Sequence, residues 1–213
     1  MVQKLFLFHL GSITFLYHFD LIFFLNKNIF PYLSFAQEMP TGANIQSGNV
    51  TISGSGSNHL IIDQVTNKSI IDWDNFSINS SGRVDFNMPT SNSSSLNRVN
   101  GSTPSSISGK LNSNGKVMLV NPNGVIITPG AVVKTNSFTA SSLDINNEDF
   151  LNDKYSFQGK KKSSGVKNGG TIFVGDKGSA NLLGNFVSNS GIFVSSLKKI
   201  MLKACFINSP TLN

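Results

Sequence analysis

The sequence has few charged residues, a single cysteine and three histidines among 213 residues. Asp, Glu, Lys and Arg make up 13% of the chain, about half their share in an average globular protein. The lone cysteine, Cys205, excludes an intrachain disulfide framework and a metal site built from several cysteines. His9 and His18 lie in an apolar N-terminal segment, which leaves His59 as the one histidine for a catalytic triad in the rest of the chain.

The motifs of common catalytic sites are missing as well. No G-x-S-x-G, H-E-x-x-H, C-x-x-C or phosphate-binding loop occurs. Asp72 and Asp74 would face the same side of a strand, and Arg83 with Asp85 is the one pair that could do acid–base chemistry on a sheet face. We expect structural roles for these residues, and therefore no enzyme activity, no metal site and no cofactor.

Basic residues outnumber acidic ones, with a formal net charge of +6. Lysines cluster at 160–162 and at 198–199. Nucleic-acid-binding surfaces carry a recognisable motif or interleave aromatic side chains with such clusters, and neither feature is present here. We therefore expect solvated loops at both places and no nucleic-acid partner.

Short apolar runs separated by polar turns dominate the chain after residue 36. Val84, Phe86 and Met88 alternate with polar residues, as in a strand with one buried face. The chain holds 19 glycines and lacks long stretches of helix-forming residues, which favours many short strands.

Two local similarities indicate repeated strand–turn units. Residues 79–84 (NSSGRV) resemble residues 112–117 (NSNGKV), and Ile172-Phe173-Val174 recurs as Ile192-Phe193-Val194. A recurrence near 20 residues is typical of a solenoid, in which stacked strands bury a continuous interior and turn residues such as Asn and Ser stack in ladders. An antiparallel sandwich also has many short, regularly spaced strands, so these residues alone leave both folds open.

The two ends of the chain differ from the middle. Residues 1–36 are rich in Phe and Leu and end in a small-x-small site, which predicts a signal peptide cleaved between Ala36 and Gln37. A membrane anchor is the alternative, but Asp20 and Lys27 interrupt the apolar run. Residues 201–213 lose the regular pattern, and we interpret them as an irregular tail of a truncated chain.

Several segments in a fixed order resemble one known family. They are Pro40–Gly42, Ile70–Ile78 (IIDWDNFSI), Asn97–Gly101 (NRVNG), Ile107–Leu111, Asn121–Val125 (NPNGV), Ala140–Ile145 and Asp149–Leu151. Together they resemble the two-partner secretion domain of filamentous-haemagglutinin-like exoproteins. The one departure inside the hallmark segments is Asn100, which stands where the family has Thr.

The resemblance implies a fold and a role. The fold is all-β: a right-handed, single-stranded parallel β-helix with small extra-helical β elements, over residues 37–200. The role is that of an N-terminal targeting module in a Gram-negative bacterium, recognised by an outer-membrane transporter barrel with periplasmic POTRA domains. The product would be secreted or held at the cell surface after passing the periplasm and the outer membrane.

The residues that the resemblance assigns to transporter recognition or to the fold lie in two motifs. They are Asn97, Arg98, Val99 and Gly101 in the first motif, and Asn121, Pro122, Asn123 and Gly124 in the second. For the full-length protein we expect adhesion to a host-cell surface through a shaft absent from this sequence. The alternatives are a β-helix polysaccharide lyase or hydrolase, and the remnant of a contact-dependent toxin.

Overall fold

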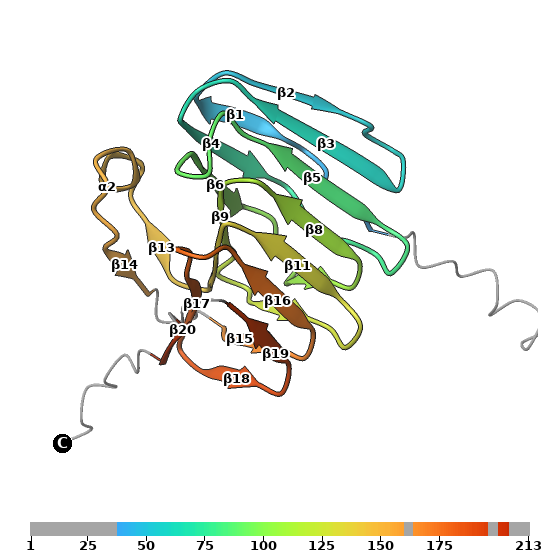
Figure 1. The fold of residues 1–213 in the computed structure, drawn as a ribbon, viewed down its shortest axis with the longest axis vertical. Helices are drawn as coiled ribbons and strands as arrows, with labels where there is room; N and C mark the ends of the chain where they lie inside the picture. The colour runs from blue at the N-terminus through green and yellow to red at the C-terminus, as the bar shows by residue number, and fades with distance from the viewer. Residues whose placement is uncertain (1–37, 160–163, 196–199, 205–213) are drawn as a thin grey trace, which may run out of the picture. The chain divides into compact units, whose positions relative to one another are not determined.

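The computed structural model describes residues 38–159, 164–195 and 200–204, and these residues are almost entirely β structure. The strands form two seven-stranded sheets, one four-stranded sheet and one two-stranded ribbon. Figure 1 shows the strands stacked on one another from the N-terminal to the C-terminal end of this region. The predicted parallel β-helix with small additional β elements is confirmed.

Sheet 1 contains β1 (Asn44–Ser47), β4 (Lys68–Trp73), β6 (Ser94–Val99), β9 (Lys116–Val120), β12 (Ser137–Ser141), β17 (Ala180–Gly184) and β20 (Ile200–Ala204). Sheet 2 contains β2 (Val50–Ser53), β3 (His59–Gln64), β5 (Arg83–Asn87), β8 (Lys110–Ser113), β11 (Val132–Thr135), β16 (Thr171–Val174) and β19 (Ile192–Val194). Sheet 3 contains β7 (Ser105–Ile107), β10 (Val125–Ile127), β15 (Val166–Asn168) and β18 (Val187–Asn189). From β6 onward, the chain visits sheets 1, 3 and 2 in turn, and each circuit makes one rung.

Successive rungs pair in parallel and in register. Ser94, Lys116 and Ser137 are paired neighbours in sheet 1, so these two rungs take 116 − 94 = 22 and 137 − 116 = 21 residues. Within the described residues, the antiparallel strand pairs are β1 with β4, β2 with β3, and the small ribbon, and one isolated antiparallel bridge joins Thr41 to Asn75. The antiparallel sandwich that the strand spacing left open is therefore wrong.

Neither local similarity aligns equivalent positions of the rungs. Val84 lies on β5 of sheet 2, whereas Val117 lies on β9 of sheet 1. The second similarity is off by one residue, because Ile172 pairs with Phe193 rather than with Ile192. A shift of one residue moves a side chain to the other face of a sheet, and Ile192 is indeed 61% exposed while Ile172 is fully buried.

An asparagine ladder accompanies the true register. Asn168 and Asn189 are paired residues of sheet 3, and Asn168 Nδ2 donates to Asn189 Oδ1 at 2.8 Å. The backbone N–H groups of Ser190 and Gly191 both donate to the carbonyl of Asn168. The asparagines at the turn therefore fix the register of the two rungs. The apolar triplets Ile-Phe-Val cannot fix it, because their three side chains are similar and fit either alignment.

The interior of the solenoid is filled by inward-facing apolar side chains of all three sheets. Aromatic rings fill the N-terminal half, where Trp73 meets Phe76 edge-on at 5.2 Å and Phe76 stacks on Phe86 at 6.5 Å. Each such large side chain stabilises the fold by about 1.5–3 kcal/mol through burial. Trp73 also has a buried polar partner, which is described with the candidate site.

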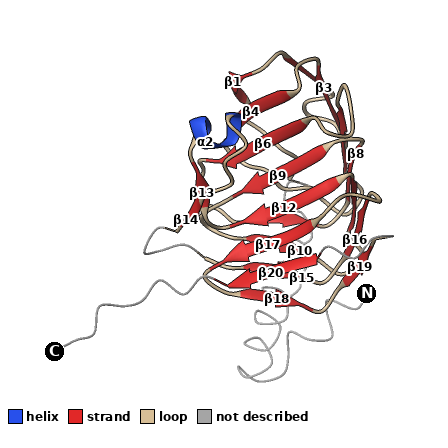
Figure 2. Ribbon diagram, turned by 60° about the vertical axis from the view of Figure 1, so that its left-hand side comes forward, coloured by secondary structure: helices blue, strands red, loops and turns tan. Residues whose placement is uncertain are grey.

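A segment between rungs folds back over the outer face of sheet 1. It contains β13 (Asp144–Ile145), α2 (Asn147–Leu151) and β14 (Phe157–Gln158), and we call residues 143–158 the strap. Ile145 and Phe150 of the strap pack on outward-facing residues of β4, β6 and β9, namely Ile70, Leu96, Met118 and Val120. Figure 2 shows the strap beside the strands of sheet 1.

The two ends of the described solenoid are built differently. At the N-terminal end, β1 and β2 pair antiparallel to the first parallel strands and so cap the stack. At the other end β20 pairs in parallel with β17 from Ile200 to Ala204. Regular backbone pairing thus continues to Ala204, four residues past the predicted boundary at residue 200.

The structure does not describe the residues of the remaining boundary predictions. The predicted signal peptide, its cleavage site at Ala36 and Gln37, and the tail residues 205–213 lie outside the described residues. Among the residues that are described, no helix has the length and apolar character needed to cross a membrane.

Candidate functional site

The first motif occupies the end of β6 and the turn after it. Asn97 is fully buried, facing the solenoid interior between Ile71 and Leu119 in register. Its Oδ1 accepts the indole N–H of Trp73 at 3.0 Å, and its Nδ2 lies within bonding distance of Ser95 Oγ and of the Met118 carbonyl. A polar group buried in this way is tolerated because its hydrogen bonds are satisfied.

Val99 and Gly101 both lie against residues of the preceding rung. Val99 is 2% exposed and belongs to the main core. A Cβ at Gly101 would overlap the backbone carbonyl of Asp74, so only glycine allows the chain to pass this close. Between them, the exposed Asn100 donates its backbone N–H to the Trp73 carbonyl at 2.8 Å.

Arg98 points out of sheet 1 and fastens the strap. Its Nε donates to Asp144 Oδ1 at 2.9 Å, and one terminal N–H donates to the Ile145 carbonyl at 2.6 Å. The other terminal nitrogen reaches Asp72 on the neighbouring strand at 3.2 Å. With 14% of its side chain exposed, Arg98 uses the fork geometry that a lysine lacks.

The second motif forms the corner between β9 and β10. Asn121 is fully buried, and its Oδ1 accepts the Asn123 backbone N–H at 2.9 Å, which closes an Asx turn. The Gly124 N–H donates to the Asn121 carbonyl at 2.8 Å. Gly124 has φ 111°, a left-handed conformation that disfavours other residues. The Pro122 carbonyl accepts the N–H of Ser164, where the chain returns from the strap.

The side chain of Asn123 joins the two motifs directly, and that of Asn121 binds the residues just after the first motif. Asn123 Nδ2 donates to the Gly101 carbonyl at 2.8 Å. Asn121 Nδ2 donates to the Thr103 carbonyl and to Ser105 Oγ, both at 3.0 Å. Segments about 20 residues apart in sequence thus form one corner of the solenoid on adjacent rungs.

Sequence reasoning placed these residues in two motifs but missed their partners. Asp72 was expected to have a structural role on a strand face and binds Arg98, whereas Trp73, expected only to pack in the sheet, also binds Asn97. Asp144 lies 46 residues from Arg98 in the chain. The small number of charged residues was a usable signal for the Arg98 partner. An outward-facing arginine on a strand is expected to pair with a carboxylate on the neighbouring strand, and Asp72 is the residue paired with Arg98 in the sheet.

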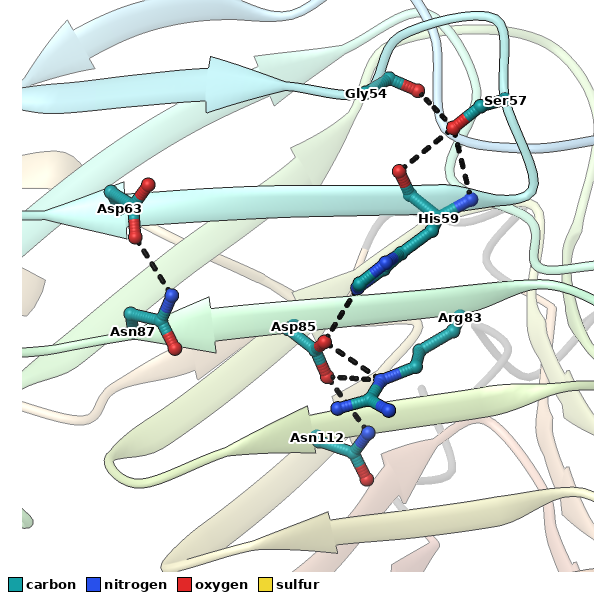
Figure 3. A network of polar contacts seen from close by, with 8 residues as sticks. All are labelled: Gly54, Ser57, His59, Asp63, Arg83, Asp85, Asn87 and Asn112. Atoms are coloured by element: carbon teal, nitrogen blue, oxygen red, sulfur yellow. Dashed lines mark hydrogen bonds and ion pairs between the residues drawn. The ribbon is translucent and has the colours of Figure 1, made fainter.

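A second polar cluster lies on the outer face of sheet 2. Figure 3 shows Asp85 at its centre, contacted by Arg83 Nε at 2.7 Å, by His59 Nε2 at 2.7 Å and by Asn112 Nδ2 at 2.8 Å. Burial alone would raise the pKa of Asp85, but the hydrogen bonds from Arg83, Asn112 and His59 outweigh it and lower that pKa. The side chain of His59 is 47% exposed.

The paired carboxylates Asp72 and Asp74 and a metal site were also considered from the sequence. Asp72 binds Arg98, whereas Asp74 is exposed one residue beyond β4, so the two carboxylates do not act as a pair. Throughout the described part of the chain, no cluster of three or more His, Cys, Asp or Glu side chains is arranged to hold a metal ion.

The fold and the linked motifs define a β-helical domain with an asparagine-built corner. The family model described as "TPS secretion domain" matches residues 36–205. The chain therefore belongs to the two-partner secretion domain family.

Two curated relatives and one solved structure show the extent of this similarity. Both relatives are named heme/hemopexin-binding protein and come from Haemophilus influenzae. One, from strain Rd, is 43% identical over 110 residues, which are 52% of this chain and 12% of that protein. The other is 38% identical over 119 residues, or 56% of this chain and 13% of that protein. The chain thus spans a small part of their length.

The solved structure is the crystal structure of the HMW1 secretion domain from Haemophilus influenzae. It matches with a TM-score of 0.72 and 37% sequence identity, over 76% of this chain and 44% of that one. Fold and family are therefore supported independently.

Proposed function

We propose that this chain is the N-terminal secretion module of a longer exoprotein that leaves the cell by two-partner secretion. An outer-membrane transporter barrel with periplasmic POTRA domains recognises the module. The observation that carries the proposal is the match to the secretion domain family together with the direct contact between its two hallmark motifs, through Asn123 and Gly101.

The fold suits export of an unfolded chain followed by folding outside. The rungs form from consecutive residues, so each new rung can pair with the one already formed. The lone Cys205 means that no intrachain disulfide blocks passage through a narrow pore. The exported product is then secreted or displayed at the cell surface.

Adhesion to host cells is the role that we propose for the full-length protein, with a contact-dependent toxin as the alternative. The matched relatives are named for heme and hemopexin binding. Because this chain covers 12% and 13% of those proteins, that ligand is not part of the proposal.

We further propose that the module is not an enzyme. A β-helix lyase or hydrolase would need an available acid or base, and Asp85 is the strongest candidate. Its two carboxylate oxygens already accept from Arg83, His59 and Asn112 on three successive strands. Such a saturated carboxylate favours a structural clamp between rungs over catalysis.

The test is export in a Gram-negative host that expresses the chain together with a candidate transporter barrel. We expect the processed chain in the medium only when the barrel is present. Asn121→Ala should lower export, whereas Asn92→Ala, at an exposed position of another turn, should not. Export without the barrel, or equal export of the Asn121 variant, would contradict the proposal or the assignment of this motif.

A further inference from the structure

Four asparagines of this chain are followed directly by glycine. They are Asn100, Asn114, Asn123 and Asn168. Asparagine is a thermolabile residue, and a glycine after it leaves the next backbone nitrogen unshielded, because glycine has no Cβ. That nitrogen can attack the asparagine Cγ and release ammonia. In a folded protein the attack depends on two groups, the asparagine side-chain amide and the N–H of the glycine, and on whether hydrogen bonds hold them.

The asparagine side chains of three of these pairs are held by a neighbouring rung. Asn114 Nδ2 donates to the Met88 carbonyl at 2.6 Å, and Asn123 Nδ2 donates to the Gly101 carbonyl at 2.8 Å. Asn168 takes part in the asparagine ladder through a bond of 2.8 Å. Each of these amides must therefore leave an acceptor before its Cγ can turn toward the following nitrogen.

The glycine N–H groups of the same three pairs are hydrogen-bonded as well. Their acceptors are a hydroxyl and two backbone carbonyls: Ser113 Oγ for Gly115 at 2.9 Å, the Asn121 carbonyl for Gly124 at 2.8 Å and the Ile127 carbonyl for Gly169 at 2.8 Å. A nitrogen that donates in this way can attack only after the bond has opened. Such local opening costs free energy, so these three pairs are protected while the domain is folded.

The fourth pair, Asn100 and Gly101, lacks both restraints. It lies in the turn after β6, where Asn100 is exposed. Within the part of the chain that the structure describes, neither the Asn100 side-chain amide nor the Gly101 N–H makes a hydrogen bond. The backbone on either side is anchored, by the Asn100 N–H on the Trp73 carbonyl and by the Asn123 amide on the Gly101 carbonyl. The Asn100 side chain can therefore turn toward the glycine nitrogen without breaking a bond.

We propose that Asn100 is the site at which the folded domain deamidates. The Gly101 nitrogen loses its proton to base and attacks Asn100 Cγ, the Cγ–Nδ2 bond breaks, and Nδ2 leaves as ammonia. Water then opens the five-membered succinimide at one of its two carbonyls, which gives aspartate or isoaspartate. The net reaction exchanges an amino group for a hydroxyl group, consumes water and adds one negative charge. The threonine that the family has at this position cannot react in this way.

The isoaspartate product changes the main chain as well as the charge. Its backbone runs through Cβ and Cγ, which adds one main-chain atom between the Asn100 N–H and the Gly101 carbonyl. Both of these groups are anchored to neighbouring rungs, so the longer linkage should strain the turn. Neither the reaction nor this consequence depends on the proposed secretion function.

The test follows all four pairs in one sample. Trypsin places them on separate peptides, namely residues 99–110, 111–116, 117–134 and 168–177. The full chain is incubated in mildly alkaline buffer, either folded or in urea, and the peptides are analysed by mass spectrometry. In the folded chain we expect peptide 99–110 to deamidate at least about tenfold faster than the other three, because those pairs must first break hydrogen bonds. In urea all four should react at similar rates.

Two variants complete the test. Asn100→Thr should remove the product from peptide 99–110 and leave the other three peptides unchanged. Asn100→Asp carries the added charge without the longer main chain, so it should unfold at the same urea concentration as the parent, whereas the incubated chain should contain a fraction that unfolds at a lower one. Labelling by an isoaspartyl methyltransferase identifies that fraction.

The proposal is overturned if Asn100 stays intact in the folded chain while it reacts in urea. It is also overturned if another of the four pairs reacts as fast as Asn100 in the folded chain. If the isoaspartate fraction unfolds at the same urea concentration as Asn100→Asp, the longer main chain does not strain the turn and that consequence is wrong.

Discussion

Replacing Asn121 by alanine should destabilise the folded domain strongly, although the residue lies in a turn. The side chain makes three hydrogen bonds, to the Thr103 carbonyl, to Ser105 Oγ and from the Asn123 N–H, and it is fully buried. Each bond contributes about 1 kcal/mol net, and the fully buried Ser105 loses its partner where water cannot replace it. We therefore expect a loss of about 3 kcal/mol in the free energy of unfolding.

Urea unfolding of residues 37–213 measures this loss. Trp73 is the one tryptophan and is 1% exposed, so its fluorescence reports the core next to the first motif. Asn123→Ala, which removes one partly exposed bond, is the matched comparison and should cost about 1 kcal/mol. A control at the exposed Asn92 should change stability by less than about 0.5 kcal/mol.

The aspartate variant separates hydrogen bonding from size. Asn121→Asp keeps the acceptor for the Asn123 N–H but turns a carboxylate oxygen toward the Thr103 carbonyl. Burying a charge beside an acceptor is unfavourable, so this variant should be less stable than Asn121→Ala. If Asn121→Ala costs no more than Asn123→Ala, the corner is not held by this amide and the reasoning fails.

Three further predictions concern the strap, the close approach of the rungs and one phenol. Arg98→Lys should lower stability by about 1–2 kcal/mol because a lysine cannot make all three contacts, and limited proteolysis should cut the strap sooner. Gly101→Ala should lower the unfolding midpoint in urea because its Cβ would overlap a backbone carbonyl. Burial and the hydrogen bond to Asp153 raise the pKa of Tyr155 to about 12. In residues 37–213 Tyr155 is the sole tyrosine, so absorbance titration should show one phenol near that value, and Asp153→Asn should lower it. Since the folded pKa exceeds the unfolded value of about 10, this group contributes stability that is present below pH 10 and lost as the pH rises toward 12.

Local signals predicted short strands and turns, whereas the β-helix itself was predicted from the family resemblance, because the strand spacing alone left an antiparallel sandwich open. The geometry of a turn such as residues 121–124 can be predicted from its sequence, since Asn, Pro and Gly each favour a particular backbone conformation. The two motifs lie on successive rungs, because β6 pairs with β9, and this proximity was not predicted. What local signals could not predict was the phase of the repeat, as the pairing of Ile172 with Phe193 shows.

The packing of the strap on sheet 1 was not predicted from the sequence, for a physical reason. Its packing joins residues far apart in the chain, such as Phe150 with Ile70 and Arg98 with Asp144. Outward-facing apolar residues on β4, β6 and β9 were the available clue, because an exposed strip of this kind needs a cover. In sequence, however, an apolar residue next to another on a strand does not reveal which of the two faces outward.

The burial of the hallmark residues constrains how a transporter can use them. Asn97 and Asn121 are fully enclosed in the folded domain, so a partner can read them only before folding or through the shape that they maintain. Export of an unfolded chain, as proposed, requires the first route, because the two asparagines are accessible only before the domain folds. The bonds from Asn121 and Asn123 to the Thr103 and Gly101 carbonyls then form when the corner folds outside the cell. The same residues can therefore serve recognition before folding and hold two adjacent rungs together after it.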